Sequence, residues 1–110
     1  MGAFVRGDVV VLPFPFSDLS ATKRRPALVV ATLSGADIIL CQITSQASRD
    51  AYAIPLLDED FADGGLRQAS FIRPSRLFTA DSAIVLYRAG IISEAKQAAV
   101  AAALVDLFKV

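Results

Sequence analysis

The chain contains no histidine and no tryptophan, and it has a single cysteine, Cys41. Without histidine, Ser-His-Asp and Cys-His catalysis are excluded, as are the paired imidazoles that many ribonucleases use. One cysteine can form no internal disulfide and no cysteine-based zinc site, and inside the apolar run 38–43 it is expected to be a small buried side chain. Any acid–base work must fall to carboxylates, hydroxyls, Tyr, Lys or Arg.

The chain also lacks an excess of charge, because 11 basic residues balance 11 acidic ones. Proteins that bind duplex nucleic acid usually carry a basic excess, so a broad electrostatic footprint is not expected. A short single-stranded target in a local basic cleft remains compatible with this balance. The acidic residues gather over 58–63 without the spacing of a calcium loop, which predicts a solvated loop and no metal or other cofactor.

No apolar run approaches the roughly 20 residues that span a bilayer, and the N-terminal residues do not resemble a signal peptide. These observations predict a cytoplasmic protein without membrane contact. With 110 residues, 55% of them hydrophobic, the chain is expected to form one domain over residues 1–110 with a substantial core.

The middle of the chain is typical of many short strands, and its end is typical of a helix. Pro13 and Pro15 are expected to end the first strand, Pro26 to lie at the edge or start of the second, and residues 34–37 to form a hairpin turn. From Ser93, a predicted N-cap, apolar residues recur at helical spacing and predict a helix packed hard onto the body. The strands are expected over residues 9–11, 24–32, 38–44, 52–56, 70–73, 76–79 and 83–88.

This pattern predicts a mainly β fold, a small and strongly bent sheet or partly open barrel with a C-terminal helix. Such a barrel leaves edges and apolar surface that a two-fold partner could cover, so a homodimer is expected.

The junction at residues 23–30 joins three consecutive cations to an apolar strand. Counting back from the hairpin turn places Arg25, at the start of one strand, beside Thr44, at the end of the next. A guanidinium neutralises phosphate oxygens and a hydroxyl donates a hydrogen bond, so this pair could hold a phosphodiester. A solvated basic turn and a structural threonine are the alternatives that these residues leave open.

The segment before this junction could flank the same site. Phe14 and Phe16 could stack on bases, or they could pack in a core or an interface. Ser20 is compatible with an ordinary turn. Arg73 could extend the basic surface or serve as the partner of a surface ion pair.

Several segments together resemble the MazF/PemK family of toxin endoribonucleases, and the likeness covers nearly the whole chain. It is carried by Gly-Asp-Val after Arg6, by Arg-Pro-Ala at 25–27 and by Ile-Thr-Ser at 43–45. It continues through residues 70–79 to the terminal helix.

The resemblance implies an SH3-like β-barrel with an added helix, a homodimer, and a cognate antitoxin that contacts the protein and joins it in DNA binding. It also implies metal-independent cleavage of single-stranded RNA, leaving a 2′,3′-cyclic phosphate and a 5′-hydroxyl. Arg25 would be the central catalytic residue and Thr44 its partner. The implied substrate-binding residues are Phe16, Ser20, Lys23, Arg24, Ser45, Gln46 and Arg73.

Two other functions are compatible with the same fold. One is a non-enzymatic toxin that acts by protein contact, as the gyrase-poisoning relatives do. The other is an inactive module kept for its antitoxin interface. Arg-Pro-Ala together with Ile-Thr-Ser favours the nuclease, because a toxin that acts by contact alone would not need that pair.

Overall fold

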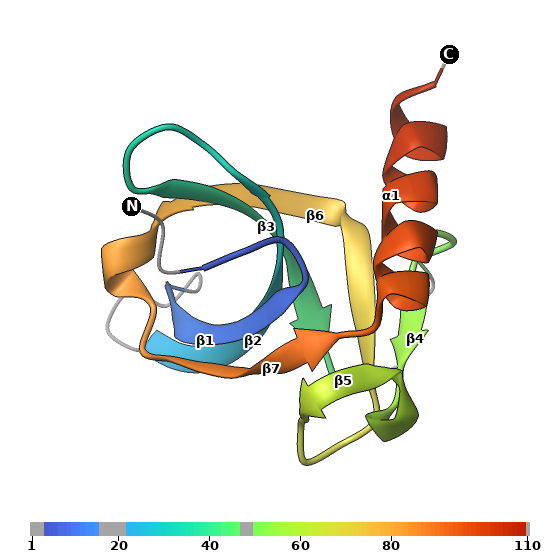
Figure 1. Cartoon of the computed structure of the whole chain (residues 1–110), viewed down its shortest axis with the longest axis horizontal. Helices are drawn as coiled ribbons and strands as arrows, with labels where there is room; N and C mark the ends of the chain where they lie inside the picture. Colours follow the sequence, from blue (N-terminus) through green and yellow to red (C-terminus); the bar gives the residue numbers. More distant parts are fainter. Residues whose placement is uncertain (1–3, 16–21, 47–49, 110) are drawn as a thin grey trace.

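The computed structural model describes residues 4–15, 22–46 and 50–109. Seven strands in this part of the chain form one antiparallel sheet in the order β4-β6-β3-β2-β1-β7-β5. The sheet curls into a half-barrel, and helix α1 stands along one side of it (Figure 1). The elements are β1 (Asp8–Pro15), β2 (Thr22–Thr32), β3 (Asp37–Thr44), β4 (Ile54–Leu56), η1 (Asp58–Asp60), β5 (Phe61–Gly64), β6 (Ser70–Asp81), η2 (Ser82–Ile84), β7 (Tyr87–Ile92) and α1 (Glu94–Phe108). The predicted mainly β fold with a C-terminal helix is confirmed.

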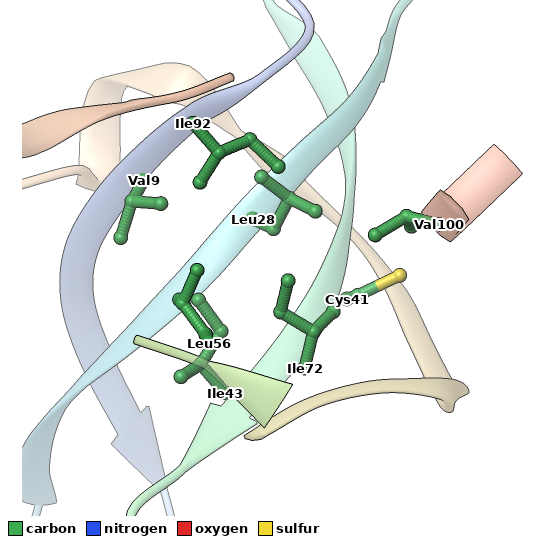
Figure 2. Packing of buried hydrophobic residues seen from close by; sticks show 8 residues of the cluster. All are labelled: Val9, Leu28, Cys41, Ile43, Leu56, Ile72, Ile92 and Val100. Atoms are coloured by element: carbon green, nitrogen blue, oxygen red, sulfur yellow. The ribbon is translucent and has the colours of Figure 1, made fainter. Parts of the chain in front are cut away.

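Successive residues of a strand point to opposite faces of the sheet, and each face of this sheet carries its own apolar core. We call the first the helix-side core, because it includes Val100 of α1; Figure 2 shows how its side chains lie. We call the other the second core. The helix-side core consists of Val9, Leu28, Cys41, Ile43, Leu56, Ile72, Ile92 and Val100. The second core consists of Val10, Leu12, Ala27, Val29, Ile38 and Leu40.

Cys41 is fully buried in the helix-side core, as the sequence predicted. Burial raises the pKa of its thiol to about 12. The thiol is therefore protonated at neutral pH, and a protonated thiol is a poor nucleophile and a poor metal ligand.

The prolines of β1 do not end its pairing, which corrects the sequence prediction. Pro13 pairs with Arg24 and Pro15 with Thr22, so β1 follows β2 to its end. The carbonyl of Val11 accepts a hydrogen bond from the N–H of Leu86, so it points away from β2. Residues 13 and 15 share that orientation, and β7 pairs with β1 only as far as Val11. Their ring nitrogens therefore face an unpaired edge, where no N–H is required.

Pro26 lies within β2, not at its edge or start, because β2 begins at Thr22. It pairs with Val11 across β1 and so directs its nitrogen toward β3. Proline has no N–H to donate, and the ladder between β2 and β3 ends one residue later in β2, at the pair Ala27 and Gln42. Among the described residues, β2 and β3 form no further pair with each other beyond this point, although each stays paired with its other neighbour, β1 or β6.

The sequence predicted two strands around Pro74, but β6 is a single strand from Ser70 to Asp81. Arg73 pairs with Gln42 and Leu77 with Cys41, so three residues of β6, 74–76, lie between two adjacent residues of β3. This bulge accommodates the proline and turns the side chains after it to the opposite face.

The last strand is also placed differently from its prediction. Residues 82–84 form the short helix η2, and β7 spans Tyr87–Ile92 and includes Gly90. Gly90 pairs with Gly64 of the unpredicted strand β5. A Cβ atom on Gly64 would lie 2.2 Å from the carbonyl oxygen of Ala89, so the two backbones approach too closely for any side chain.

Helix α1 begins as predicted, because the Ser93 hydroxyl accepts a hydrogen bond from the Lys96 N–H at 3.2 Å. The expectation that it packs hard onto the body is wrong. Val100 is its only buried residue in the described part of the helix, and Val105 and Phe108 are 63% and 67% exposed. Along the described ranges, no helix is both long and apolar enough to cross a membrane.

Candidate functional site

The candidate site lies where the pairing of β2 with β3 ends. The register pairs Ala27 with Gln42, and two residues further along each strand stand Arg25 and Thr44. Arg25 lies opposite Leu12 on β1, and Thr44 lies opposite Phe71 on β6. These four residues thus form one row across the sheet, and opposite residues of antiparallel strands share a face. The register therefore places Arg25 and Thr44 in one row on the face of the second core, at the same end of the hairpin, as the count from the turn predicted.

The two side chains differ from ordinary surface groups in their surroundings. Arg25 is half-buried, and its Nε atom is shielded from solvent. The Thr44 hydroxyl accepts a hydrogen bond from the Gln46 N–H at 3.2 Å. This bond fixes the hydroxyl oxygen and leaves its own hydrogen available to a ligand.

The neighbouring row supplies a second cation on the same face. Arg73 lies opposite Gln42, one row from Thr44 and about 7 Å along the strand. Its Nε donates to the Asp50 carboxylate at 3.2 Å, and its side chain is 22% exposed against 7% for Asp50. Ser75, delivered by the bulge in β6, donates its hydroxyl to the same carboxylate oxygen. Arg73 therefore forms an ion pair with Asp50, which is one of the two roles that the sequence predicted for it. This ion pair lies beside the row that contains Arg25 and Thr44.

The sequence analysis did not identify Asp50, Ser75 or Gln42 as part of this region. Asp50 ends a polar run after β3, and no motif marks it. Only the bulge in β6 brings Ser75 within reach of it, and such a bulge leaves no clear pattern in the sequence. Gln42 could have been found, because it lies two residues before Thr44 in the same strand and so shares its face.

The contribution of Asp50 to the stability of the fold is expected to depend on pH. The Ser75 hydroxyl, and then the Tyr52 N–H and Arg73, lower the pKa of Asp50, against the opposing effect of burial. A carboxylate with a lowered folded-state pKa stabilises the fold above its unfolded pKa of about 3.9 and loses that contribution as the pH falls through the folded value. We expect Asp50→Asn to be less stable than wild type at pH 7, with a difference that narrows as the pH falls to about 3.

Urea unfolding of both proteins across this pH range measures the difference. Asp106→Asn, which removes an exposed carboxylate on α1, controls for the change in net charge. A difference between wild type and Asp50→Asn that stays constant from pH 7 to pH 3 would contradict the role of Asp50.

The other predicted residues are divided between the faces. Lys23 is exposed on β2, on the face of Arg25, whereas Arg24 alternates to the opposite face. Ser45 and Gln46 form an exposed bend after β3, and Ser45 lines the same hollow as Arg24. Phe16 and Ser20 lie outside the described residues.

A groove of about 830 Å³ adjoins the row on the face of the second core. Leu12, Phe14, Gln42, Arg76 and Phe78 contribute to its lining. The rings of Phe14 and Phe78 pack edge to face with centroids 5.0 Å apart. Phe14 therefore has the packing role, which is one of the two roles that the sequence left open for it. Across the described ranges, no group of three or more Cys, Asp or Glu residues is arranged to hold a metal ion.

A curled antiparallel sheet of seven strands with one terminal helix places the described part of the chain in the class of small, mainly β half-barrels. Residues 5–108 match the model of the PemK-like, MazF-like toxins of type II toxin–antitoxin systems. The chain therefore belongs to this family of toxins. A search of curated proteins gives no match.

Three solved structures are among those that share this fold. The Mycobacterium tuberculosis toxin MazF-mt6 has a TM-score of 0.73 and 19% identity, over 94% of this chain and 97% of that one. MazE–MazF from Deinococcus radiodurans has a TM-score of 0.71 and 18% identity, over 94% and 93%. An endoribonuclease in complex with its cognate antitoxin from a mycobacterial species has a TM-score of 0.69 and 17% identity, over 96% and 93%. At these identities the likeness shows the fold alone.

Proposed function

We propose that this toxin is an endoribonuclease that cleaves single-stranded RNA without a metal ion. The observation that carries the proposal is the placement of Arg25 and Thr44 in one row on one face, two residues beyond the last pair of β2 and β3, Ala27 and Gln42. A phosphodiester needs neutralisation of its non-bridging oxygens, and a half-buried guanidinium fixed at a strand end provides it. Family membership, and the likeness of the fold to that of an endoribonuclease from a mycobacterial species, support the same activity.

The reaction follows from the chemistry of RNA, which carries its own nucleophile. The 2′-oxygen attacks the adjacent phosphorus and forms a P–O2′ bond, while the P–O5′ bond breaks. The 2′-hydroxyl loses its proton to water or to a group that acts as a general base, and the departing 5′-oxygen takes up a proton. The products are a 2′,3′-cyclic phosphate and a 5′-hydroxyl.

The protein's share of this reaction is positioning and charge stabilisation. Arg25 stabilises the charge that builds on the phosphate oxygens in the transition state. A guanidinium stays protonated, so this is a better role for it than that of general base. Thr44 donates its hydroxyl hydrogen to the phosphate and orients it, and Arg73, paired with Asp50, lies beside the same row.

We further propose that the toxin acts as a homodimer and is controlled by a cognate antitoxin. The apolar side chains that α1 leaves exposed, Val105 and Phe108, are surface that a protein partner could cover. One similar structure is an endoribonuclease in complex with its cognate antitoxin and another is MazE–MazF, which supports the second partner.

Incubation of the purified protein with a long single-stranded RNA in EDTA tests the activity. We expect discrete fragments with 5′-hydroxyl ends, since the proposed reaction needs no divalent cation. A 5′-end map of the fragments would give the cleavage motif. Intact RNA would contradict the proposal and favour a toxin that acts by protein contact, whereas fragments that appear only with added Mg²⁺ would contradict the mechanism.

A further inference from the structure

A second basic hollow lies on the other face of the sheet from Arg25. Side chains alternate along β2, so Arg24 points to the face of the helix-side core while Arg25 points to the face of the second core. Arg24 there lines a groove of about 640 Å³ together with Arg67, Arg88, Tyr87 and Ser45. The two sites are adjacent where the pairing of β2 and β3 ends, because Arg24 directly precedes Arg25 and Ser45 directly follows Thr44.

The charge of this groove differs from that of the whole chain. Three arginines line it, and no carboxylate does so among the described residues, although the chain as a whole has no net charge. Neither Arg24 nor Arg67 takes part in the ion pairs found within the described ranges. The groove therefore presents uncompensated positive charge, which attracts a polyanion.

Arg88 forms an ion pair with a buried carboxylate. Its Nε lies 3.4 Å from a carboxylate oxygen of Asp8, which is fully buried, while the Arg88 side chain is 48% exposed. The other oxygen of Asp8 accepts a hydrogen bond from the Val5 N–H at 2.9 Å. Arg88 lies opposite Val10, so its side chain is directed to the face of the second core, where Asp8 holds it, and the cations that this groove offers to a ligand are Arg24 and Arg67.

An aromatic side chain accompanies these cations. Tyr87 is 53% exposed and lines the groove beside Arg88. Alternation of cations with an exposed ring suits single-stranded nucleic acid, in which phosphates need charge and unstacked bases need a flat apolar surface. An acidic peptide would use the arginines but would leave the ring without a matching group.

We propose that this groove binds the RNA chain beyond the scissile phosphate, with Arg24 and Arg67 contacting phosphates and Tyr87 stacking on a base. The proposal rests on the proposed function, because it extends the same substrate from one face of the sheet to the other. The RNA then passes around the ends of β2 and β3, with the cleaved bond at Arg25 and the flanking nucleotides at Arg24.

Binding to an RNA that cannot be cleaved tests the groove separately from catalysis. The probe is a fluorescein-labelled 2′-O-methyl RNA of mixed sequence and 20 nucleotides, which lacks the attacking hydroxyl. Fluorescence anisotropy at several salt concentrations would compare the wild type with Arg67→Gln, Tyr87→Ala and the exposed control Lys109→Gln. Circular dichroism of each variant would establish that the fold is retained.

We expect Arg67→Gln to weaken binding and to reduce the slope of log K against log salt by about 0.7, the value of one lost phosphate contact on a single strand. Tyr87→Ala should weaken binding about tenfold and leave the slope unchanged, since stacking releases no counterion. Lys109→Gln should bind like the wild type. Arg67→Gln and Tyr87→Ala proteins that both bind like the control would overturn the proposal.

Two further outcomes separate this proposal from the others. If the wild type leaves RNA intact but binds the probe through Arg67 and Tyr87, the nuclease function fails and the groove stands. If the wild type cleaves RNA and the two substitutions leave probe binding unchanged, the groove fails and the nuclease stands. The Arg67→Gln protein could instead bind a polyglutamate peptide more weakly than the wild type does while binding the RNA probe equally well. That result would assign the groove to a protein partner and overturn the RNA proposal.

Discussion

Replacing Arg25 with alanine should lower the rate of RNA cleavage by about 10²–10³-fold, the usual effect of removing one preorganised donor to a developing negative charge. The side chain belongs to neither apolar core, so the fold should survive. Arg25→Lys should recover only part of the activity, because lysine keeps the charge but loses the planar fork that matches a phosphate. Single-turnover cleavage of a labelled RNA, at saturating enzyme, measures these rates.

The matched control is Lys109→Ala, which removes one positive charge at the exposed end of α1. We expect it to cleave like the wild type, which would separate a local effect at the strand end from a general loss of RNA attraction. Unfolding midpoints would show whether each variant is folded. A folded Arg25→Ala protein with full activity would refute the assignment of Arg25, and so would an equal loss in Lys109→Ala.

Gly64→Ala should have the largest effect on stability among conservative substitutions of the glycines. Gly64 has φ +74°, a left-handed conformation that costs a residue with a side chain about 1–2 kcal/mol. The added Cβ would also lie 2.2 Å from the Ala89 oxygen and 2.6 Å from the Gly90 Cα. Both are backbone atoms of a paired strand, so relief requires movement of β5 or β7. The total loss should be roughly 2–5 kcal/mol.

Gly35 provides a control for the backbone contribution. It has φ +81° in the hairpin turn, and a Cβ there would meet no atom within 4 Å. Gly35→Ala should therefore lose only about 1–2 kcal/mol. Urea unfolding of both variants gives the two free energies. Equal losses would show that the close approach of β5 and β7 contributes nothing, and that the conformation alone requires glycine at position 64.

Much of the fold could be predicted from the sequence because its signals are local. The turn at 34–37 and the alternation of apolar residues define the β2–β3 hairpin, and this alone brings Arg25 and Thr44 to the same end. The helix start was also readable, because the cap requires only Ser93 and the turn that follows it.

The errors arose where a residue's effect depends on distant partners. Proline was expected to end pairing, yet Pro13 faces an edge where β7 has already ended, and that edge is set by residues about 75 positions away. The same dependence hid β5, which is recognisable only through its pairing with β7. In the site, Asp50 reaches Arg73 and Ser75 because β6 bulges, and no pattern of neighbouring residues in the sequence predicts that bulge.

The order of the strands has a consequence for how the toxin is made. The first strand, β1, is paired on one side with its neighbour β2 but on the other with β7, the last strand of the chain. A ribosome releases β1, β2 and β3, and with them Arg25 and Thr44, long before β7 emerges. Until then the edge of β1 from Asp8 to Val11 has no partner, and pairing of such separated segments is slow. A nascent or truncated chain that ends before Tyr87 would carry Arg25 and Thr44 on an incomplete sheet, and we expect it to lack activity until β7 has paired with β1.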